Sequence, residues 1–416
     1  MRYYRFPDNR WTRIAFGAFL TAILFLARDS MFTMAVIGFE KSQFLMLGLV
    51  CTAALLFLAV NRREWKAILT DRRMIFLAVS TVVCLLPMIV KRDWQLMYCS
   101  VLFCLYVAVF LSYFLTVRQV ARYYVLIMSV LGAYSVLAAY VLRIGVDEGV
   151  YAVPVFLNSL GIEFHNFFLS IVPETYVKNR NFGIFREPGV YQFFLIVALY
   201  LNNYTLSWKK DWQMWLINGI LAVTMLSTFA TGGVAELGLL AVVLFFDKKW
   251  YRDKRICAVA AALVLCVAAI VGVSILQKNE LYWEVYSMVV GKFVNGQDSS
   301  VERIDAVLTD ITIFLNHPLF GAELAQVLYA TANNTTSTLI LCAGFGILPS
   351  ALNVIAWIAL VWEKQRKVWV NLALLAILFL SFNTQNLIAD VFFWLFPVMA
   401  LVERAAPKLH FSAGKG

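Results

Sequence analysis

Long apolar runs dominate the chain and limit what it can fold into. About twelve runs of roughly 17 to 25 residues, the length of a helix that crosses a membrane, recur along it. They begin near Trp11, Gln43, Met74, Leu96, Tyr123, Val190, Met214, Val234, Ile256, Ser337, Val368 and Leu387. Of the 416 residues, 62% are hydrophobic and 14% are charged, whereas a soluble domain carries roughly a quarter charged residues. The sequence therefore predicts an all-α, polytopic integral membrane protein.

Basic residues lie in alternate loops between these runs. Lys and Arg in short loops stay on the cytoplasmic side of a membrane. The N-terminus and alternate loops carry them, as in the groups Arg2 to Arg13, Arg62 to Arg73, Arg118 and Arg122, Lys209 and Lys210, Lys248 to Arg255, and Lys364 to Lys367. This pattern predicts that both termini are cytoplasmic. It also accounts for the net charge of +10 through contact with anionic lipid headgroups, so nucleic acid is not implied as a partner. Lys91 and Arg92, in a short outer loop, are exceptions to the rule.

The predicted runs divide the chain into five parts. Residues 1–142 hold the first five membrane helices, 143–189 form a long outer segment, and 190–275 hold helices six to nine. Residues 276–336 form a second long outer segment, and 337–416 hold the last three helices and a cytoplasmic tail. Outer segments of this length are usually functional.

Each outer segment contains a pattern that predicts an amphipathic helix. In the first, phenylalanines recur near helical spacing between Phe156 and Leu169, which predicts a helix on the membrane surface. In the second, Ser299 and Glu302 have the spacing of a capping box. Apolar residues follow on one face of that helix, namely Val301, Ile304, Leu308, Ile311 and Leu315.

The stretch NRNFGIFREPGVYQ, residues 179–192, places charge directly before an apolar run. Arg180, Arg186 and Lys178, together with Arg303 of the second outer segment, are candidates to bind one polyanion, and a pyrophosphate fits best. Arginine suits this role because its planar fork binds phosphate oxygens bidentately. The alternative is structural, since Pro188 suits a first helical turn and Glu187 suits the helix dipole.

Several other polar residues lie near the outer ends of the runs. Gly232 and Gly233 permit either a tight helical hairpin or a close approach of backbone N–H groups to phosphate. Glu236 is an ionisable residue inside an apolar run, where such residues are functional candidates. Asp305 and His317 flank the predicted helix of the second outer segment. All of these remain candidates for the site.

The chemistry suggested by these residues is departure of a pyrophosphate. Glu187, beside Arg186, is a candidate general base that removes a proton from an attacking hydroxyl, while arginines stabilise the leaving pyrophosphate. Glu236, His317 and Asp305 are the alternatives for the base. The outer segments have neither an Asp-x-Asp nor an HExxH motif, so no metal and no cofactor is indicated.

Three ordered motifs carry a resemblance to a known family. FGIFREPGVYQFFL, LSTFATGGVAELGLL and SSVERIDAVLTDITIFLNHPLFG together resemble the motifs of the bacterial O-antigen polymerase and O-antigen ligase superfamily. The resemblance covers residues from about 180 to 350. It implies an inner-membrane glycosyltransferase with a periplasmic active face. Such an enzyme transfers a glycan from undecaprenyl pyrophosphate to a sugar hydroxyl, without metal or nucleotide sugar. The family's arginines fall on Arg180, Arg186 and Arg303.

One departure from the family pattern favours the polymerase branch. The ligase branch has a His-Asn pair about eleven residues before a glycine, and Asn333 and Asn334 occupy that place here. The resemblance then implies a repeat-unit polymerase for O-antigen or capsule. Its partners are undecaprenyl-pyrophosphate-linked oligosaccharide as donor and acceptor, membrane lipids, and a chain-length regulator protein. The alternatives are a ligase that uses lipid A core as acceptor, and a flippase for lipid-linked oligosaccharide.

Overall fold

The computed structural model describes residues 10–31, 38–60, 70–157, 162–174, 180–254, 257–258, 269, 273, 276, 299–331 and 334–405. The described chain is mostly helical, as the sequence predicts. Its helices are α1 (Arg10–Phe25), α2 (Phe39–Val60), α4 (Arg72–Lys91), α5 (Leu96–Ser112), α6 (Val117–Leu137), the π-helical turn η3 (Ala138–Leu142), α7 (Arg143–Asp147), α8 (Pro188–Tyr204), α9 (Asp211–Ser227), α10 (Thr231–Asp247), the 3-10 turn η4 (Trp250–Arg252), α14 (Ser299–Asn316), α15 (Leu324–Tyr329), α16 (Ser337–Phe345), α17 (Ile347–Val361), α18 (Val368–Phe382) and α19 (Val391–Ala405).

A helix begins close to the start of each predicted apolar run except the ninth, which starts near Ile256 and lies mostly outside the described residues. Within the described part, two helices are long and apolar enough to cross a membrane: α4, and the continuous helix Val117–Asp147 made of α6, η3 and α7. Several other apolar helices, such as α5 and α17, are shorter. The number of about twelve spans therefore stays a prediction.

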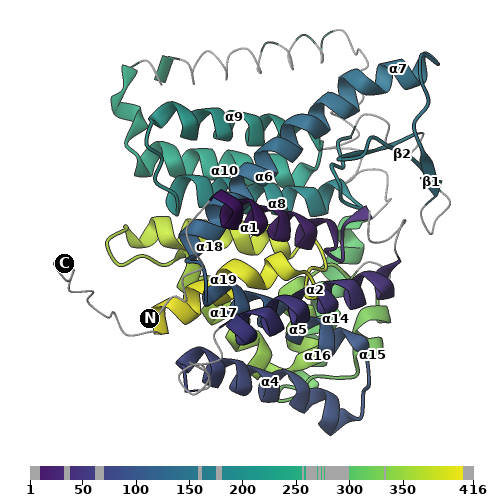
Figure 1. Ribbon diagram of the computed structural model, residues 1–416, viewed down its shortest axis with the longest axis vertical. Coiled ribbons are helices and arrows are strands. Elements are labelled where there is room, and N and C mark those ends of the chain that lie inside the picture. Colours follow the sequence, from purple (N-terminus) through teal and green to yellow (C-terminus); the bar gives the residue numbers. More distant parts are fainter. Residues whose placement is uncertain are drawn as a thin grey trace.

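Helix α8 lies at the centre of the bundle, where its residues from Val190 to Leu201 are all buried. Aromatic rings join it to its surroundings, since Phe194 contacts Phe185 at 4.2 Å and Phe392 of α19 at 5.6 Å between ring centroids. In Figure 1, α9 and α10 lie on one side of α8, and α18 and α19 lie on the other. Such burial on all sides matches its continuously apolar sequence.

The first outer segment contains a sheet where a surface helix is predicted from Phe156 to Leu169, so that prediction is wrong. Strands β1 (Val155–Leu157), β2 (Glu163–Asn166) and β3 (Ile171–Pro173) form an antiparallel sheet in that order. Phe156 lies opposite Phe164, and their rings stack at 5.8 Å. The phenylalanines thus pair across two strands instead of lining one helical face.

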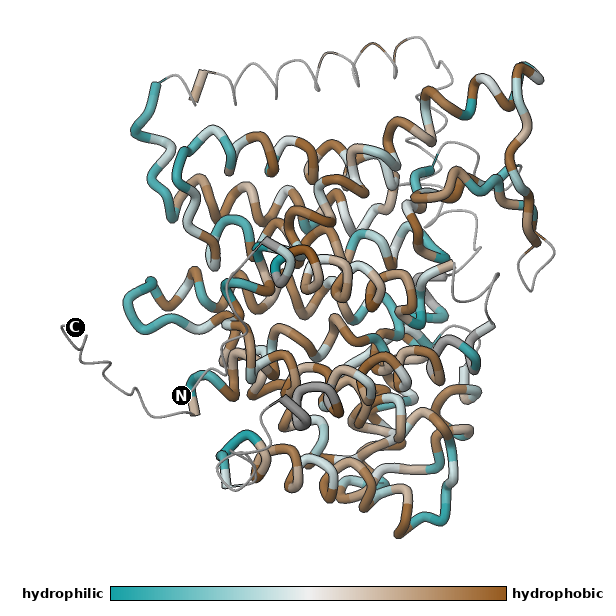
Figure 2. Tube along the Cα trace, viewed as in Figure 1, coloured by the Kyte–Doolittle hydropathy of each residue, from teal (hydrophilic) through white to brown (hydrophobic). Residues whose placement is uncertain are grey.

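Polar residues gather at two opposite ends of the helices. In Figure 1, the sheet and α7 lie at the right, whereas the turn between α17 and α18 lies at the left. Figure 2 shows hydrophilic residues in that turn and near the sheet, with hydrophobic residues along the helices between them. Two polar ends with an apolar middle are consistent with a membrane-embedded bundle.

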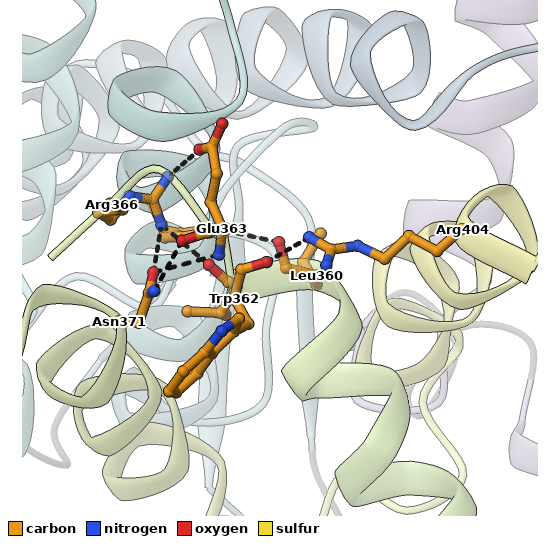
Figure 3. Close-up of polar contacts among 8 residues, drawn as sticks. Leu360, Trp362, Glu363, Arg366, Asn371 and Arg404 are labelled. Atoms are coloured by element: carbon orange, nitrogen blue, oxygen red, sulfur yellow. Dashed lines mark hydrogen bonds and ion pairs between the residues drawn. The ribbon is translucent and has the colours of Figure 1, made fainter. Parts of the chain in front are cut away.

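The turn between α17 and α18 is closed by its own side chains (Figure 3). Arg366 donates through Nη1 to the Val361 carbonyl at 2.9 Å and through Nη2 to Glu363 Oε2 at 2.9 Å. Asn371 donates to the Glu363 carbonyl at 2.9 Å, and Arg404 of α19 donates to the Trp362 carbonyl. Arg366, one of the basic residues that predict a cytoplasmic loop, therefore also fixes the shape of this turn.

Candidate functional site

The segment that carries Arg180 and Arg186 is fixed by a buried asparagine. Asn181 donates through Nδ2 to Ser135 Oγ of α6 and to Ser227 Oγ of α9, each at 2.9 Å, and accepts the Gly183 N–H at 2.9 Å. Gly183 has φ of +57°, and a Cβ there would lie 2.6 Å from the Tyr191 ring. This position needs glycine both for its left-handed backbone and for its close contact. The arginine segment therefore has a defined conformation.

Arg186 lies between two carboxylates. Its Nε donates to Asp29 Oδ1 at 2.7 Å, and its Nη1 contacts Glu187 Oε1 at 3.2 Å. The Asp29 side chain is 3% exposed, whereas those of Arg186 and Glu187 are 28% and 48% exposed. The negative charge of Asp29 raises the pKa of the Arg186 guanidinium above its ordinary value. Arg186 thus stays charged, and part of its side chain is exposed at the surface of the protein.

Arg180, Lys178 and the other cations of the proposed anion site have different positions. Arg180 donates through Nε to the Thr228 carbonyl at 3.0 Å, which anchors it at the end of α9. Lys178 lies outside the described residues. Arg303 is exposed near the start of α14. Arg180 and Arg186 are thus fixed on one short segment before α8, whereas Arg303 lies on a different element, α14.

Glu236 lies deep in the bundle, where α10 meets α8. It is 0% exposed, and its Oε1 accepts a hydrogen bond from Gln192 Nε2 at 3.2 Å. The predicted glycines explain this approach, because a Cβ at Gly232 or Gly233 would lie 3.0 Å from the Gln192 amide. Gln192 Nε2 also lies 3.3 Å from Thr384 Oγ1. The two glycines therefore permit close packing of α10 on α8.

The polar segment between α18 and α19 joins the start of α8 to the start of α16. A Cβ on Gly189 would lie 2.4 Å from Gln385 Nε2, so that amide covers the first turn of α8. Ser337 Oγ, at the start of α16, donates to the Gln385 carbonyl at 2.5 Å and accepts the Leu387 N–H at 2.8 Å. The start of α16 is thereby connected, through the segment between α18 and α19, to the first turn of α8.

Asp310 is a buried carboxylate on α14. Its Oδ1 accepts from Asn334 Nδ2 and its Oδ2 accepts from Thr336 Oγ1, both at 2.9 Å. Burial raises the pKa of Asp310 to about 6. Arg303 precedes it by two helical turns, so both residues lie on nearly the same side of α14. The predicted apolar stripe lies on another side and is exposed at Ile304, Leu308, Ile311 and Leu315.

Asp305 and His317 are exposed on α14, Asp305 near its start and His317 directly after its end. In this conformation neither lies in the buried network of Asp310. The residues that the sequence reasoning missed are Asp29, Gln192 and Asp310. Gln192 was the most visible of them, because an amide inside an apolar run needs a buried partner.

The contacts of Arg186 define what this site can do chemically. Asp29 is bonded to Nε, and the exposed Glu187 is bonded to Nη1 at the other end of the guanidinium. An arginine held in this way presents its terminal nitrogens to an oxyanion. The site thus suits a phosphate or pyrophosphate group at the polar end of the bundle.

Comparisons of the chain with protein-family models, with curated proteins and with solved structures find no match. The arrangement of residues within the chain is therefore the basis of the functional assignment.

Proposed function

We propose that this protein is a polysaccharide repeat-unit polymerase of the bacterial inner membrane, related to the O-antigen polymerases and ligases that its motifs resemble. It transfers a glycan from undecaprenyl pyrophosphate to a sugar hydroxyl of a second lipid-linked repeat unit, without a metal. The observation that carries the proposal is Arg186, a partly exposed arginine whose orientation is set by a buried carboxylate. Its segment is one of the three resembling motifs.

The proposed topology has about twelve membrane helices, both termini in the cytoplasm and the site in the periplasm. Exposed apolar residues support it. On α4, Ile75, Val79 and Val82 are 57%, 56% and 61% exposed and follow one another at helical spacing. Contiguous exposed apolar surface requires a cover in a stable protein, and lipid would supply that cover here.

In the proposed reaction, the acceptor hydroxyl oxygen attacks the anomeric carbon of the donor glycan. The bond between that carbon and the pyrophosphate oxygen breaks, and its electron pair leaves with undecaprenyl pyrophosphate. Arg186 and Arg303 stabilise the charge that develops on the pyrophosphate. Glu187 remains the proposed base for the hydroxyl proton, because it is exposed beside Arg186.

The second outer segment supports a lipid-linked substrate. The exposed apolar stripe of α14 and the exposed Arg303 lie on different sides of one helix. A polyprenyl pyrophosphate has the same two parts, an apolar tail and an anionic head. We therefore place the tail along Ile304, Leu308 and Leu315, and the head near Arg303.

The proposal is tested with purified full-length protein in detergent and a lipid-linked repeat unit as donor and acceptor. Arg186→Lys keeps the charge but removes the fork, and we expect polymer formation to fall about 10- to 100-fold, as for loss of a charged hydrogen bond. Arg252→Lys, on the exposed turn η4, is the control and should form normal polymer. Normal ladders from Arg186→Lys and from Arg303→Lys would contradict the assigned site.

The same assay separates the alternatives. Polymer formation in detergent excludes a flippase that performs no chemistry. Transfer to lipid A core, with no elongation of the lipid-linked unit, would instead indicate a ligase.

A further inference from the structure

The chain directly after α1 forms the surface on which the Arg186 segment is held. Ser30 and Phe185 form an antiparallel β-bridge. On either side of it, the Met31 N–H donates to the Ile184 carbonyl at 2.8 Å and the Arg186 N–H donates to the Asp29 carbonyl at 3.0 Å. Two short segments far apart in the sequence are therefore paired along their backbones.

The Asp29 side chain adds a charged contact to this backbone pairing. Its Oδ1 lies 2.7 Å from Arg186 Nε, although the two residues are 157 positions apart. A buried carboxylate is costly unless a counter-charge is close. Arg186 and Arg28 supply positive charge beside Asp29, and Asp390 at the start of α19 is a second carboxylate in the same electrostatic cluster. The cluster therefore holds two basic and two acidic side chains.

The atom that Asp29 contacts determines what it does to Arg186. A bond to Nε fixes the plane of the guanidinium and restricts rotation of the fork about the end of its aliphatic stem. The half-exposed Glu187 meets Nη1 at 3.2 Å, and the Arg186 side chain is 28% exposed, so the fork lies partly open beside a carboxylate. A fork that is already oriented loses less rotational freedom when it binds phosphate.

We infer that Asp29 is a positioning residue for Arg186, which holds the guanidinium so that its terminal nitrogens meet the pyrophosphate of the lipid-linked donor. This inference rests on the proposed function and extends its site to the end of α1. Asp29 acts through Arg186 and does not itself contact the substrate. The pyrophosphate displaces Glu187 from Nη1 when it binds.

The test is a double-mutant cycle on polymer formation by the purified full-length protein. Asp29→Leu removes the acceptor at similar volume, and we expect kcat/KM to fall about 10-fold or more. Asp29→Asn keeps an oxygen acceptor and should lose less activity. In an Arg186→Lys background, Asp29→Leu should cause less than about a twofold further loss, because lysine has no Nε–H fork to orient.

The control variant removes the carboxylate of a different arginine–aspartate ion pair. Asp147 pairs with Arg143 on α7 at 3.3 Å, and Asp147→Asn should leave kcat/KM unchanged. Thermal unfolding of each variant shows how much of each loss comes from folding. Inhibition by inorganic pyrophosphate provides a second readout, and Asp29→Leu should weaken it in parallel with kcat/KM.

Two results would overturn the inference. Wild-type activity of Asp29→Leu would show that orientation by Asp29 is unimportant. Equal losses from Asp29→Leu in the wild-type background and in the Arg186→Lys background would show that Asp29 only supports the fold. Normal activity of Arg186→Lys itself is a different outcome, because it contradicts the assignment of Arg186 to the pyrophosphate site and not only the role of Asp29. Absence of polymer formation by the wild-type protein would instead contradict the proposed function.

Discussion

Asp310 offers a sharp test of the polar network, because its burial links stability to pH. The residue is 0% exposed, and burial raises its pKa from 3.8 to about 6. A raised pKa in the folded state means that folding favours the protonated carboxyl. The associated stability is fully present below pH 3.8 and is lost as the pH rises through about 6. Above that range, the ionised Asp310 costs about 3 kcal/mol relative to the protonated form.

Asp310→Asn removes this cost while keeping the network. The amide oxygen can accept from Asn334 Nδ2, and the amide nitrogen can donate to Thr336 Oγ1, which now meets Asp310 Oδ2 at 2.9 Å. The hydroxyl of Thr336 has a second acceptor in Asn334 Oδ1 at 3.3 Å. No buried polar atom needs to lose its partner.

The expected result is a difference in stability that depends on pH. At pH 7.5, Asp310→Asn should be about 3 kcal/mol more stable than the wild type, which corresponds to roughly 3 °C in Tm for a chain of this length. Near pH 4 the two Tm values should coincide. Thermal unfolding of the purified protein in detergent between pH 4 and 8 measures this directly.

One titratable neighbour and one control variant complete the design. Cys342 of α16 is the titratable group that interacts electrostatically with Asp310, and it remains a neutral thiol over this pH range. Asp305→Asn, at an exposed position on the same helix, should not change the pH dependence of Tm. An Asp310→Asn protein that is less stable than the wild type at pH 7.5, or equally stable at every pH, refutes the reasoning.

Two further predictions concern packing and anchoring. Gly233→Ala should lower stability by about 1–3 kcal/mol through overpacking, because its Cβ would lie 3.0 Å from Gln192 Oε1 and 3.2 Å from Gln192 Cβ. Gly238→Ala on the same helix, where nothing lies within 4 Å, should be neutral or slightly stabilising; equal Tm values for both variants would contradict this. Lys91→Met should lower stability by about 2–3 kcal/mol, because Lys91 Nζ donates to two carbonyl oxygens at 2.5 and 2.6 Å. Arg92→Met, at an exposed neighbour, should leave Tm nearly unchanged, and a loss as large as that of Lys91→Met would refute the anchoring role.

The helical class of the fold was predictable because it follows from local sequence. An apolar run of sufficient length predicts a helix wherever it occurs, and helices are found near the predicted starts from Trp11 to Leu387 within the described residues. Two signals for helix starts also succeeded, since Pro188 is the first residue of α8 and α14 starts at Ser299. These features depend on neighbouring residues alone.

The sheet and the partners of the site were less predictable because they depend on distant residues. Phe156 and Phe164 fit helical spacing and strand pairing almost equally well, and the sheet also makes contacts that the local sequence does not indicate, such as that of Phe164 with Phe182 at 5.7 Å. Asp29 lies in an outer segment with no local signal for its contact with Arg186. A single sequence shows that a buried polar residue needs a partner, but not which residue supplies it.

Lys91 shows why an exception to the charge rule can be informative. In the proposed topology it lies at the outer end of α4, where a basic residue is unexpected. Its Nζ donates to the carbonyls of Ala322 and Gly344, and to Tyr98 Oη at 2.6 Å. A charge used for these internal hydrogen bonds is not available to the lipid surface. Lys91 therefore anchors α16 to the end of α4.

The helix break at Gly346, directly after α16, determines what the hold of Lys91 on α16 does for the site. Gly346 has φ of +80°, and a Cβ there would lie 2.2 Å from the Leu319 carbonyl oxygen, so the tenth apolar run is split into α16 and α17. With nine residues, α16 is about 14 Å long, too short to cross a membrane. Because α16 packs on α14 and is held by Lys91, it links the helix that carries Arg303 to the end of α4. In the proposed reaction, Arg186 and Arg303 come from distant motifs and act on one lipid-linked pyrophosphate, and the split helix α16 holds the element that carries Arg303.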